Sequence, residues 1–238
     1  MGILDPIENI MRIILHFYYN LAGYIGMANW GLAIILLTVT IKMLLYPLTV
    51  KQIKGMRSMQ KVQPKMAELQ KKHKGDKPRL QQEMAKLYKD EKVNPLSGCL
   101  PIVVQMPILI ALYWSIYGLA ELKDASFLWI PDLAAHSTIP TMILAVLSAA
   151  TTFWSTKQTQ GKQQPAANQS DQAAQTQKMM LYIMPLFIGY MTYSFPAGLG
   201  IYWVTSNLVQ IAQQWWLYKK LDEKDAAPVV VIEEKKKK

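Results

Sequence analysis

Long uncharged stretches alternate with strongly charged ones along this chain of 238 residues. The apolar stretches approach or exceed the roughly 20 residues that a helix needs to cross the hydrocarbon core of a bilayer. They lack the alternation of period two that is typical of strands in a membrane β-barrel. Because a helix satisfies its backbone polar groups internally, the pattern predicts an all-α, polytopic membrane protein with five transmembrane helices. We place these helices at residues 29–50, 98–120, 139–156, 179–195 and 199–218.

The segments between the predicted spans differ in their content of Lys and Arg. Residues 51–97 contain 13 of them, residues 157–178 contain three and residues 219–238 contain seven, whereas residues 1–29 and 121–138 contain one each. Cytosolic segments of membrane proteins carry an excess of these residues. The bias therefore predicts an N-terminus outside and a C-terminus in the cytosol, as an odd number of spans requires.

The segment before the first span carries an apolar stripe at helical spacing. It consists of Ile7, Ile10, Met11, Ile14, Leu15, Tyr18 and Leu21. Such a stripe is typical of a helix that lies in the membrane interface. We therefore predict an outer interfacial amphipathic helix at residues 1–28, and the alternative is a sixth, short span.

The basic segment 51–97 is predicted to form a cytosolic helical hairpin. Its two apolar stripes are separated by Gly75-Asp76-Lys77-Pro78, which is a strong turn signal. Pro64 interrupts the first stripe and is expected to bend or restart that helix. The remaining connections are predicted to be an outer loop, a disordered glutamine-rich cytosolic loop and a basic cytosolic tail, at residues 121–138, 157–178 and 219–238.

Lys42 is the one charged residue within the five predicted spans. A lysine near the middle of a membrane helix costs ~2.5–3.5 kcal/mol on insertion scales. Such a residue usually faces a partner, the protein interior or a wet cavity, which makes it a functional candidate. The alternative is a lysine that snorkels to the interface, because Pro47 is expected to mark the end of this helix.

Polar side chains recur on the other predicted spans. Those that share one helical face, or lie beside it, are Trp203, Asn207, Gln210, Gln214, Tyr202 and Ser206 on the fifth span, and Thr141, Ser148, Thr152 and Ser155 on the third. Gln105 lies on the second span. Amides are costly in lipid without hydrogen bonds, so we expect these faces to point inward or toward water. With Lys42 they are able to hydrate a pocket and attract negative charge.

The spans contain no carboxylate, and the three histidines do not have the spacing of metal ligands. The single cysteine, Cys99, excludes an intramolecular disulfide framework. A nucleophilic dyad in which Lys42 activates Ser148 or Ser206 is chemically possible, but nothing in the spacing supports it. We therefore expect a protein that is not an enzyme and binds no cofactor or metal; a small transporter or channel is the rival class.

Several short motifs resemble the YidC family of membrane-protein insertases, which is related to the mitochondrial Oxa and chloroplast Albino proteins. These motifs follow the family's order from residue 29 to residue 218. They are Asn29-Trp30-Gly31, Tyr46-Pro47-Leu48-Thr49, Gln63-Pro64-Lys65, Val93-Asn94-Pro95-Leu96-Ser97-Gly98-Cys99, Gln105-Met106-Pro107-Ile108, Phe195-Pro196-Ala197-Gly198-Leu199, Ser206-Asn207-Leu208-Val209 and Gln213-Gln214.

The resemblance implies five helices around a hydrophilic groove that opens to the cytosol and to lipid and is closed on the outside. It implies an insertase and chaperone of the bacterial plasma (inner) membrane. The implied partners are nascent membrane-protein clients, the Sec translocon, the lipid bilayer and, through the basic hairpin or tail, the ribosome, with no small-molecule substrate. The family's groove residues correspond to Lys42, Thr38, Gln105 and Trp203.

The chain departs from the family pattern at the basic groove residue, which is usually arginine. Lysine places a compact ammonium there in place of a planar guanidinium with five donors. We further expect the short bacterial form, without a large extracytoplasmic domain.

Overall fold

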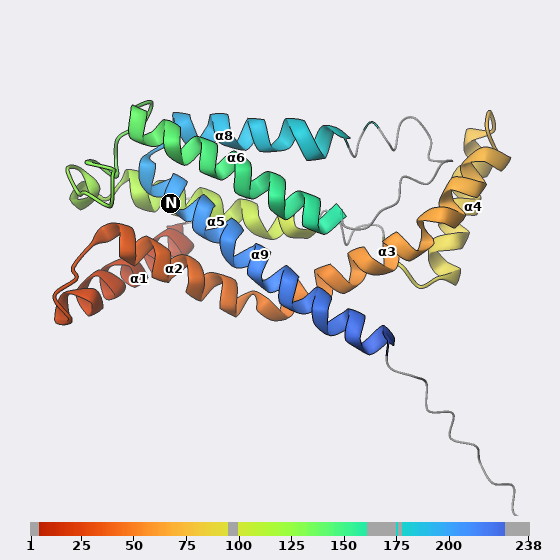
Figure 1. Ribbon diagram of the computed structural model, residues 1–238, viewed down its shortest axis with the longest axis horizontal. Coiled ribbons are helices and arrows are strands. Elements are labelled where there is room, and N and C mark those ends of the chain that lie inside the picture. Colours follow the sequence, from red (N-terminus) through yellow and green to blue (C-terminus); the bar gives the residue numbers. More distant parts are fainter. Residues whose placement is uncertain (1–4, 95–99, 161–174, 176–177, 227–238) are drawn as a thin grey trace, which may run out of the picture.

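A computed structural model describes residues 5–94, 100–160, 175 and 178–226 of the chain (Figure 1). The described part is helical and contains no strand beyond one isolated bridge between Phe127 and Ile130. The prediction of an all-α protein is confirmed for this part. Its elements are α1 Asp5–Tyr24, α2 Trp30–Leu44, α3 Tyr46–Lys72, α4 Lys77–Asp90, α5 Leu100–Tyr117, the short η2 Ala120–Leu122, α6 Ile139–Gln160, the π-helical η3 Met179–Ile183, α8 Met184–Ser194 and α9 Ala197–Ala226.

Helix α9 runs through the middle of the bundle, where it packs against α2, α6, α8 and α5 (Figure 1). Helix α1 lies against α2 and α5, and α6 lies beside α8. The buried apolar cluster includes Leu15, Ile34, Leu112, Ile116 and Leu199, and its members on α2 and α9 come from the first turns of those helices. The apolar core is therefore concentrated at the end of the bundle where α2 and α9 begin.

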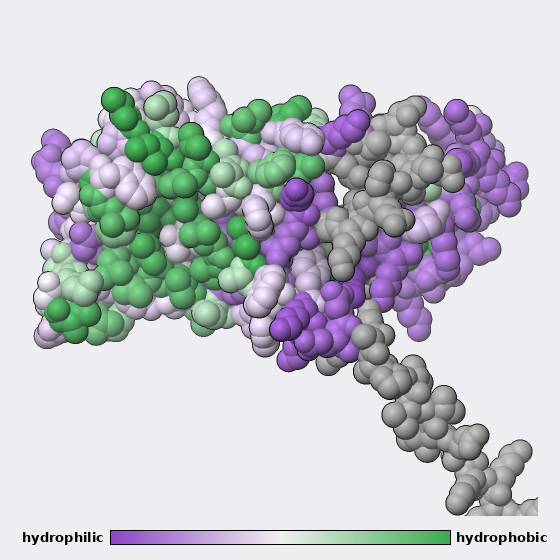
Figure 2. All heavy atoms as spheres, in the orientation of Figure 1, coloured by the Kyte–Doolittle hydropathy of each residue, from purple (hydrophilic) through white to green (hydrophobic). Residues whose placement is uncertain are grey.

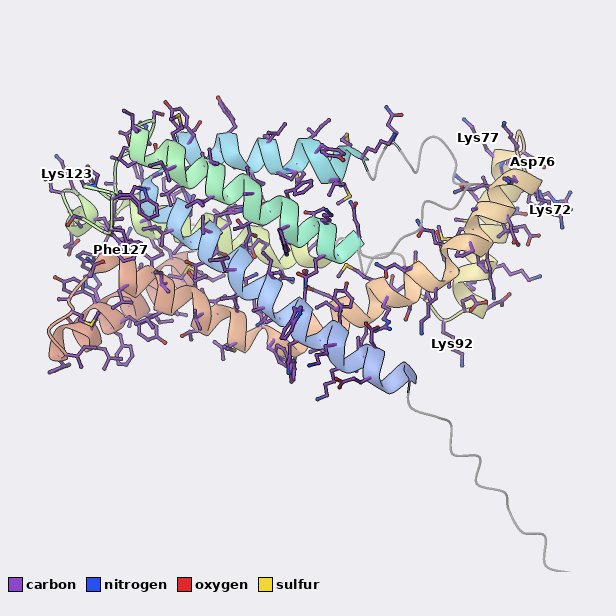
Figure 3. All side chains as sticks on the ribbon, in the orientation of Figure 1. Lys72, Asp76, Lys77, Lys92, Lys123 and Phe127 are labelled. Carbon is purple, nitrogen blue, oxygen red and sulfur yellow. The ribbon has the colours of Figure 1, made fainter. Side chains whose placement is uncertain are left out.

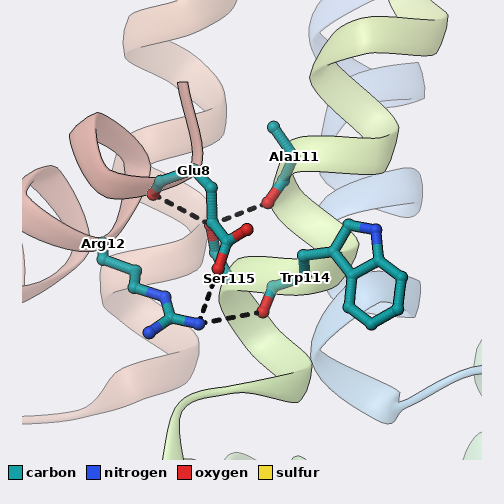
Figure 4. Close-up of polar contacts among 5 residues, drawn as sticks. All are labelled: Glu8, Arg12, Ala111, Trp114 and Ser115. Atoms are coloured by element: carbon teal, nitrogen blue, oxygen red, sulfur yellow. Dashed lines mark hydrogen bonds and ion pairs between the residues drawn. The ribbon is translucent and has the colours of Figure 1, made fainter. Parts of the chain in front are cut away.

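Helix α1 is fixed to α5 by hydrogen bonds at the end of α5 (Figure 4). The Arg12 guanidinium donates to Glu8 Oε1 at 2.7 Å and to the Trp114 carbonyl at 3.3 Å. The Ser115 hydroxyl donates to the Glu8 carbonyl at 3.2 Å. A Cβ at Gly118 would stand 2.1 Å from Arg12 Nη2, so the guanidinium lies directly against this glycine and would have to shift if a side chain were added. This face of α1 therefore packs against the bundle.

The apolar stripe predicted on residues 1–28 divides between two environments. Met11 and Leu15 are buried in the core, whereas Ile7, Ile10 and Leu21 are exposed. Helix α1 is therefore apolar toward the bundle and also toward its surroundings.

Helices α3 and α4 form a hairpin that projects from the bundle (Figure 1). The turn between them ends at Asp76, whose carboxylate accepts from the Arg79 amide at 3.0 Å and caps α4. Lys72, Asp76 and Lys77 lie at the tip of the hairpin, at the opposite end of the molecule from Lys123 and Phe127 (Figure 3). This helical hairpin covers residues 46–90, and the cytosolic hairpin at residues 51–97 stays a prediction.

The surface of the molecule changes character between these two parts. Hydrophobic residues cover the visible face of the bundle, and hydrophilic residues cover the hairpin (Figure 2). Large side chains that are exposed on the bundle include Val146, Leu186, Phe187 and Tyr190. A surface with this much exposed apolar area fits a lipid environment, because soluble proteins rarely expose such contiguous patches.

The first predicted span, residues 29–50, is not one straight helix. Helix α2 ends at Leu44 and α3 starts at Tyr46, with a bend of 60° between them. Pro47 in the first turn of α3 has no amide hydrogen, so it cannot donate to the carbonyl of Met43, four residues earlier in α2. The bend therefore falls slightly earlier than the proline itself.

Helix α3 does not restart at Pro64 but continues through it to Lys72, and a bend there stays a prediction. The Pro64 ring is exposed, so the carbonyl that loses its helical partner one turn earlier lies on a part of the helix that water reaches. Helix α9 also runs past residue 218 to Ala226, since its charged residues favour a helix where it leaves the bundle.

Length and composition alone identify fewer spans than the five predicted. Of the described helices, α6 by itself is long and apolar enough to cross a membrane. Helices α2 and α3 are together long and apolar enough if the bent pair counts as one span. The segments Val103–Tyr117 and Met179–Ser194 are shorter apolar helices. The count of five stays a prediction. Cys99, most of the loop 157–178 and the tail beyond Ala226 lie outside the described residues.

Candidate functional site

The start of α2 is fixed by Asn29, which precedes the helix. Its Oδ1 accepts hydrogen bonds from the Gly31 amide at 2.8 Å and the Leu32 amide at 3.3 Å, and its Nδ2 donates to the Ser126 carbonyl at 2.9 Å. This is an N-cap that also ties α2 to the connection between α5 and α6. A Cβ at Gly31 would stand 2.1 Å from Phe127, so the helix passes close to that ring. These contacts fix the start of α2.

Lys42 lies in the last turn of α2 and is half-buried. Its ammonium donates to Gln210 Oε1 on α9 at 3.2 Å, and its main-chain carbonyl accepts from Gln213 Nε2 at 3.2 Å. Within the described part of the chain no carboxylate lies at ion-pair distance from this ammonium. The charge is therefore met by a neutral amide and stays uncompensated.

Three other predicted residues, Thr38, Gln105 and Trp203, lie on α2, α5 and α9. Thr38 is fully buried and its hydroxyl donates to the Ile34 carbonyl at 2.6 Å within α2. Gln105 on α5 donates to the hydroxyl of Tyr202, a buried residue of α9. Trp203 is partly buried and packs against the apolar core. Gln105 and Tyr202 thus join α5 to α9.

The remaining predicted residues connect α9 to α6. Asn207 Nδ2 donates to Thr152 Oγ1 at 2.8 Å and to Thr151 Oγ1 at 3.1 Å. Gln214 Nε2 donates to Thr159 Oγ1 at 2.8 Å. Ser148 is fully buried on α6, and its hydroxyl has no hydrogen-bond partner among the described residues. The polar face predicted for α9 is therefore shared between two neighbours, α2 for Gln210 and α6 for Asn207 and Gln214.

Several polar residues are buried in the half of the bundle nearer the hairpin. Buried there are Thr49, Gln52, Ser155, Ser206, Gln213 and Gln214. One amide oxygen each of Gln213 and Gln214 has no partner among the described residues. Leaving such a group unpaired in a dry interior costs about 1–3 kcal/mol, so this half of the bundle is polar to a degree that packing alone does not require.

Gln213 is a residue that the sequence reasoning missed as a site residue. Its signal was present, because it lies three positions after Gln210 and so shares that side of α9. A separate cavity of about 440 Å³ lies elsewhere and is lined by Tyr113, Tyr117, Lys123, Asp132, His136 and Phe195 among others, none of them a predicted site residue. Groups of three or more metal-ligating side chains are absent from the described residues.

The helical bundle and its apolar surface define the class as an α-helical membrane protein. Residues 20–224 match the sequence model of the family described as 60Kd inner membrane protein, and the chain belongs to this family. The resemblance found in the motifs is thereby confirmed.

Two relatives illustrate the similarity. The "Membrane protein insertase YidC" of Histophilus somni (strain 129Pt) is 46% identical over 197 residues, which are 82% of this chain and 34% of the relative. The protein of the same name from Clostridium perfringens (strain 13 / Type A) is 40% identical over 224 residues, which are 91% of each. The chain thus spans about a third of the length of the first relative and nearly all of the second.

Proposed function

We propose that this protein is a membrane-protein insertase and chaperone of the bacterial plasma membrane. It acts on nascent membrane-protein clients, by itself or with the Sec translocon, and makes or breaks no covalent bond. Five spans surround a hydrophilic groove, with the N-terminus outside and the C-terminus in the cytosol. The names of the relatives support the activity, and the excess of Lys and Arg in three segments supports the orientation.

The observation that carries the proposal is Lys42, a half-buried positive charge whose ammonium has the Gln210 amide as its partner among the described residues. A client with a single span must move a short polar tail across the membrane. A lysine and several amides in the bundle lower the cost of placing that tail inside it. For a carboxylate about 4 Å from the ammonium, the attraction is roughly 4 kcal/mol at an effective dielectric constant of about 20.

The distribution of buried residues supports a groove that is closed outside and open to the cytosol. Apolar side chains fill the bundle where α2 and α9 begin, and polar ones occupy the half nearer the hairpin. Thr38, Gln105, Tyr202, Trp203, Asn207, Gln210, Gln214, Ser148 and Thr152 are the proposed groove residues beside Lys42. A client tail would then enter from the side of the hairpin.

The α3–α4 hairpin is proposed to meet the client, the ribosome or anionic lipid on the cytosolic side. Its exposed lysines provide positive charge, which attracts the phosphate groups of either RNA or lipid without recognising a sequence. Cysteines placed at Lys74, Gln164 and Ser126 test the orientation. Those at Lys74 and Gln164 should be labelled from the cytosolic side and that at Ser126 from outside.

Reconstitution tests the function directly. Liposomes that contain only this protein should insert a short single-span client, measured by protection of its tail from protease. Solute flux across the same liposomes without client insertion would instead support a transporter or channel. Liposomes with an unrelated helical membrane protein are the control for spontaneous insertion.

A further inference from the structure

We infer that Gln213 is a positioning residue for Lys42: its amide holds the last turn of α2 against α9 and so fixes where the Lys42 ammonium stands. Two side chains of one α9 turn hold this lysine at both of its ends. Gln210 accepts from the ammonium, and Gln213 donates to the main-chain carbonyl of the same residue.

The need for such a support follows from the bend after α2. The last four carbonyls of a helix have no amide donor from the same helix. Helix α2 ends at Leu44, so the Lys42 carbonyl in its last turn is one of these four. The Gln213 amide on α9 supplies the Lys42 carbonyl with a donor at this helix end, where the helix itself provides fewer donors than in its interior.

The geometry also fixes which way the Gln213 amide points. Its Nε2 donates at 3.2 Å to the Lys42 carbonyl, and a flipped amide would place two oxygens against each other. Gln213 is 8% exposed and its Oε1 has no described partner. A buried glutamine whose one side-chain bond among the described residues goes to the main-chain carbonyl of Lys42 suits a positioning role better than a packing role.

Gln214 provides a matched control on the next residue. It is 2% exposed and also leaves its Oε1 without a described partner, but its Nε2 bonds to Thr159 on α6. Replacing either glutamine by methionine keeps the length and approximate volume of the side chain and removes the donor. Both variants lose one buried amide from α9, but only Gln213→Met removes the bond that holds the turn of Lys42.

The test measures the position of residue 42 without relying on insertion activity. In a background with Cys99→Ser, the substitution Lys42→Cys leaves the main-chain carbonyl and its bond to Gln213 in place. The rate at which a maleimide alkylates this cysteine in liposomes should rise by about three- to tenfold with Gln213→Met, the range expected when one hydrogen bond that closes a turn is lost. Gln214→Met should leave the rate unchanged.

An unchanged rate in Gln213→Met, or an equal rise in Gln214→Met, would overturn the positioning role. Gln213→Glu provides a second variant of nearly the same shape, whose carboxylate cannot donate to the carbonyl when ionised. It should also raise the alkylation rate. The value of this positioning for clients rests on the proposed function, which separate insertion assays decide: a raised alkylation rate together with unaltered insertion would count against the role of Lys42 and not against that of Gln213.

Discussion

The bundle and the α3–α4 hairpin are held together by different kinds of contact. In the bundle, α8 approaches α6 so closely that a Cβ at Gly189 would stand 3.1 Å from the Ala145 carbonyl oxygen. In the hairpin, none of the residues of α4, all of which the structure describes, is buried, and an ion pair between Lys65 and Glu91 joins its two arms. The bundle depends on close packing, whereas the arms of the hairpin beyond Ile53 bury only Val62 and Ala67 of α3 beside an exposed ion pair.

The two regions differ in the exposure and in the partners of their lysines. Lys65 is solvated and has a carboxylate partner, whereas Lys42 is half-buried and has only amide partners among the described residues. Stability alone would favour the reverse, because an unpaired charge is cheap in water and costly in a bundle. The difference indicates that the charge in the bundle is kept for a purpose other than stability.

The largest effect on stability is expected at the contact between α6 and α8. Gly189→Leu should separate these helices, because its added atoms meet the Ala145 carbonyl and the Ala149 side chain. Overpacking a tight contact costs typically about 1–3 kcal/mol. The melting temperature in detergent should fall clearly, while Ala85→Leu on the exposed surface of α4 should leave it unchanged. Equal melting temperatures would show that the bundle is not closely packed there.

Removing the tip of the hairpin should separate client handling from bundle stability. Residues 71–79 are exposed apart from His73, so their deletion removes few contacts. Insertion of clients should weaken, and the melting temperature of the bundle should stay the same. Replacement of these residues by a Gly/Ser linker of equal length controls for chain length. Unfolding of the bundle on deletion would make the hairpin a structural support.

The contact between the base of the hairpin and α9 should have a smaller effect. Arg57 pairs with Asp222 at 2.5 Å, and Asp222 is largely exposed. Exposed ion pairs contribute about 0.2–1 kcal/mol, so a double-mutant cycle with Arg57→Ala and Asp222→Ala should give a coupling energy in that range that shrinks with added salt. The hairpin should also become more mobile, measured with spin labels at its tip. A coupling energy of zero would show that this ion pair does not hold the hairpin to α9.

The smallest effect is expected at Lys65. Its hydrogen bond to Glu91, and the charge of that residue, raise the pKa of the Lys65 ammonium above its ordinary value. A raised pKa in the folded state gives a stabilisation that is complete below the ordinary lysine pKa and is lost as the pH rises through the raised value. The mobility of a dye on α4 should therefore stay constant at neutral pH and increase slightly at strongly alkaline pH. Glu91→Gln should remove this pH dependence of the mobility. If the pH dependence is unchanged in that variant, other lysines cause it.

The sequence predicted the helices better than it predicted their contacts. Each of the five apolar stretches overlaps a described helix, because hydrophobic runs and periodicity are local properties. The bend at Leu45 and the continuation of α3 through Pro64 depend on the surroundings of each proline, which the sequence does not contain.

The partners of the polar residues on α9 depended on its neighbours. A periodic pattern places Asn207, Gln210 and Gln214 on one face, but α9 lies between α2 and α6. Small differences in angle around the helix then decide which neighbour each side chain reaches. For the same reason Gln213 gained a partner on α2 that the pattern did not assign to it.

The central claim is that the positive charge of Lys42 acts on clients, and one insertion assay tests it most directly. The chain and its variants Lys42→Arg, Lys42→Ala and Lys42→Glu are compared in liposomes on two clients that differ only in an acidic or a neutral tail. Lys42→Arg should retain activity because it keeps the charge. Lys42→Ala should lose about tenfold or more on the acidic tail, since a tenfold change corresponds to about 1.4 kcal/mol and the attraction exceeds that value, and Lys42→Glu should lose more. Full activity of Lys42→Ala on the acidic-tail client would contradict the account.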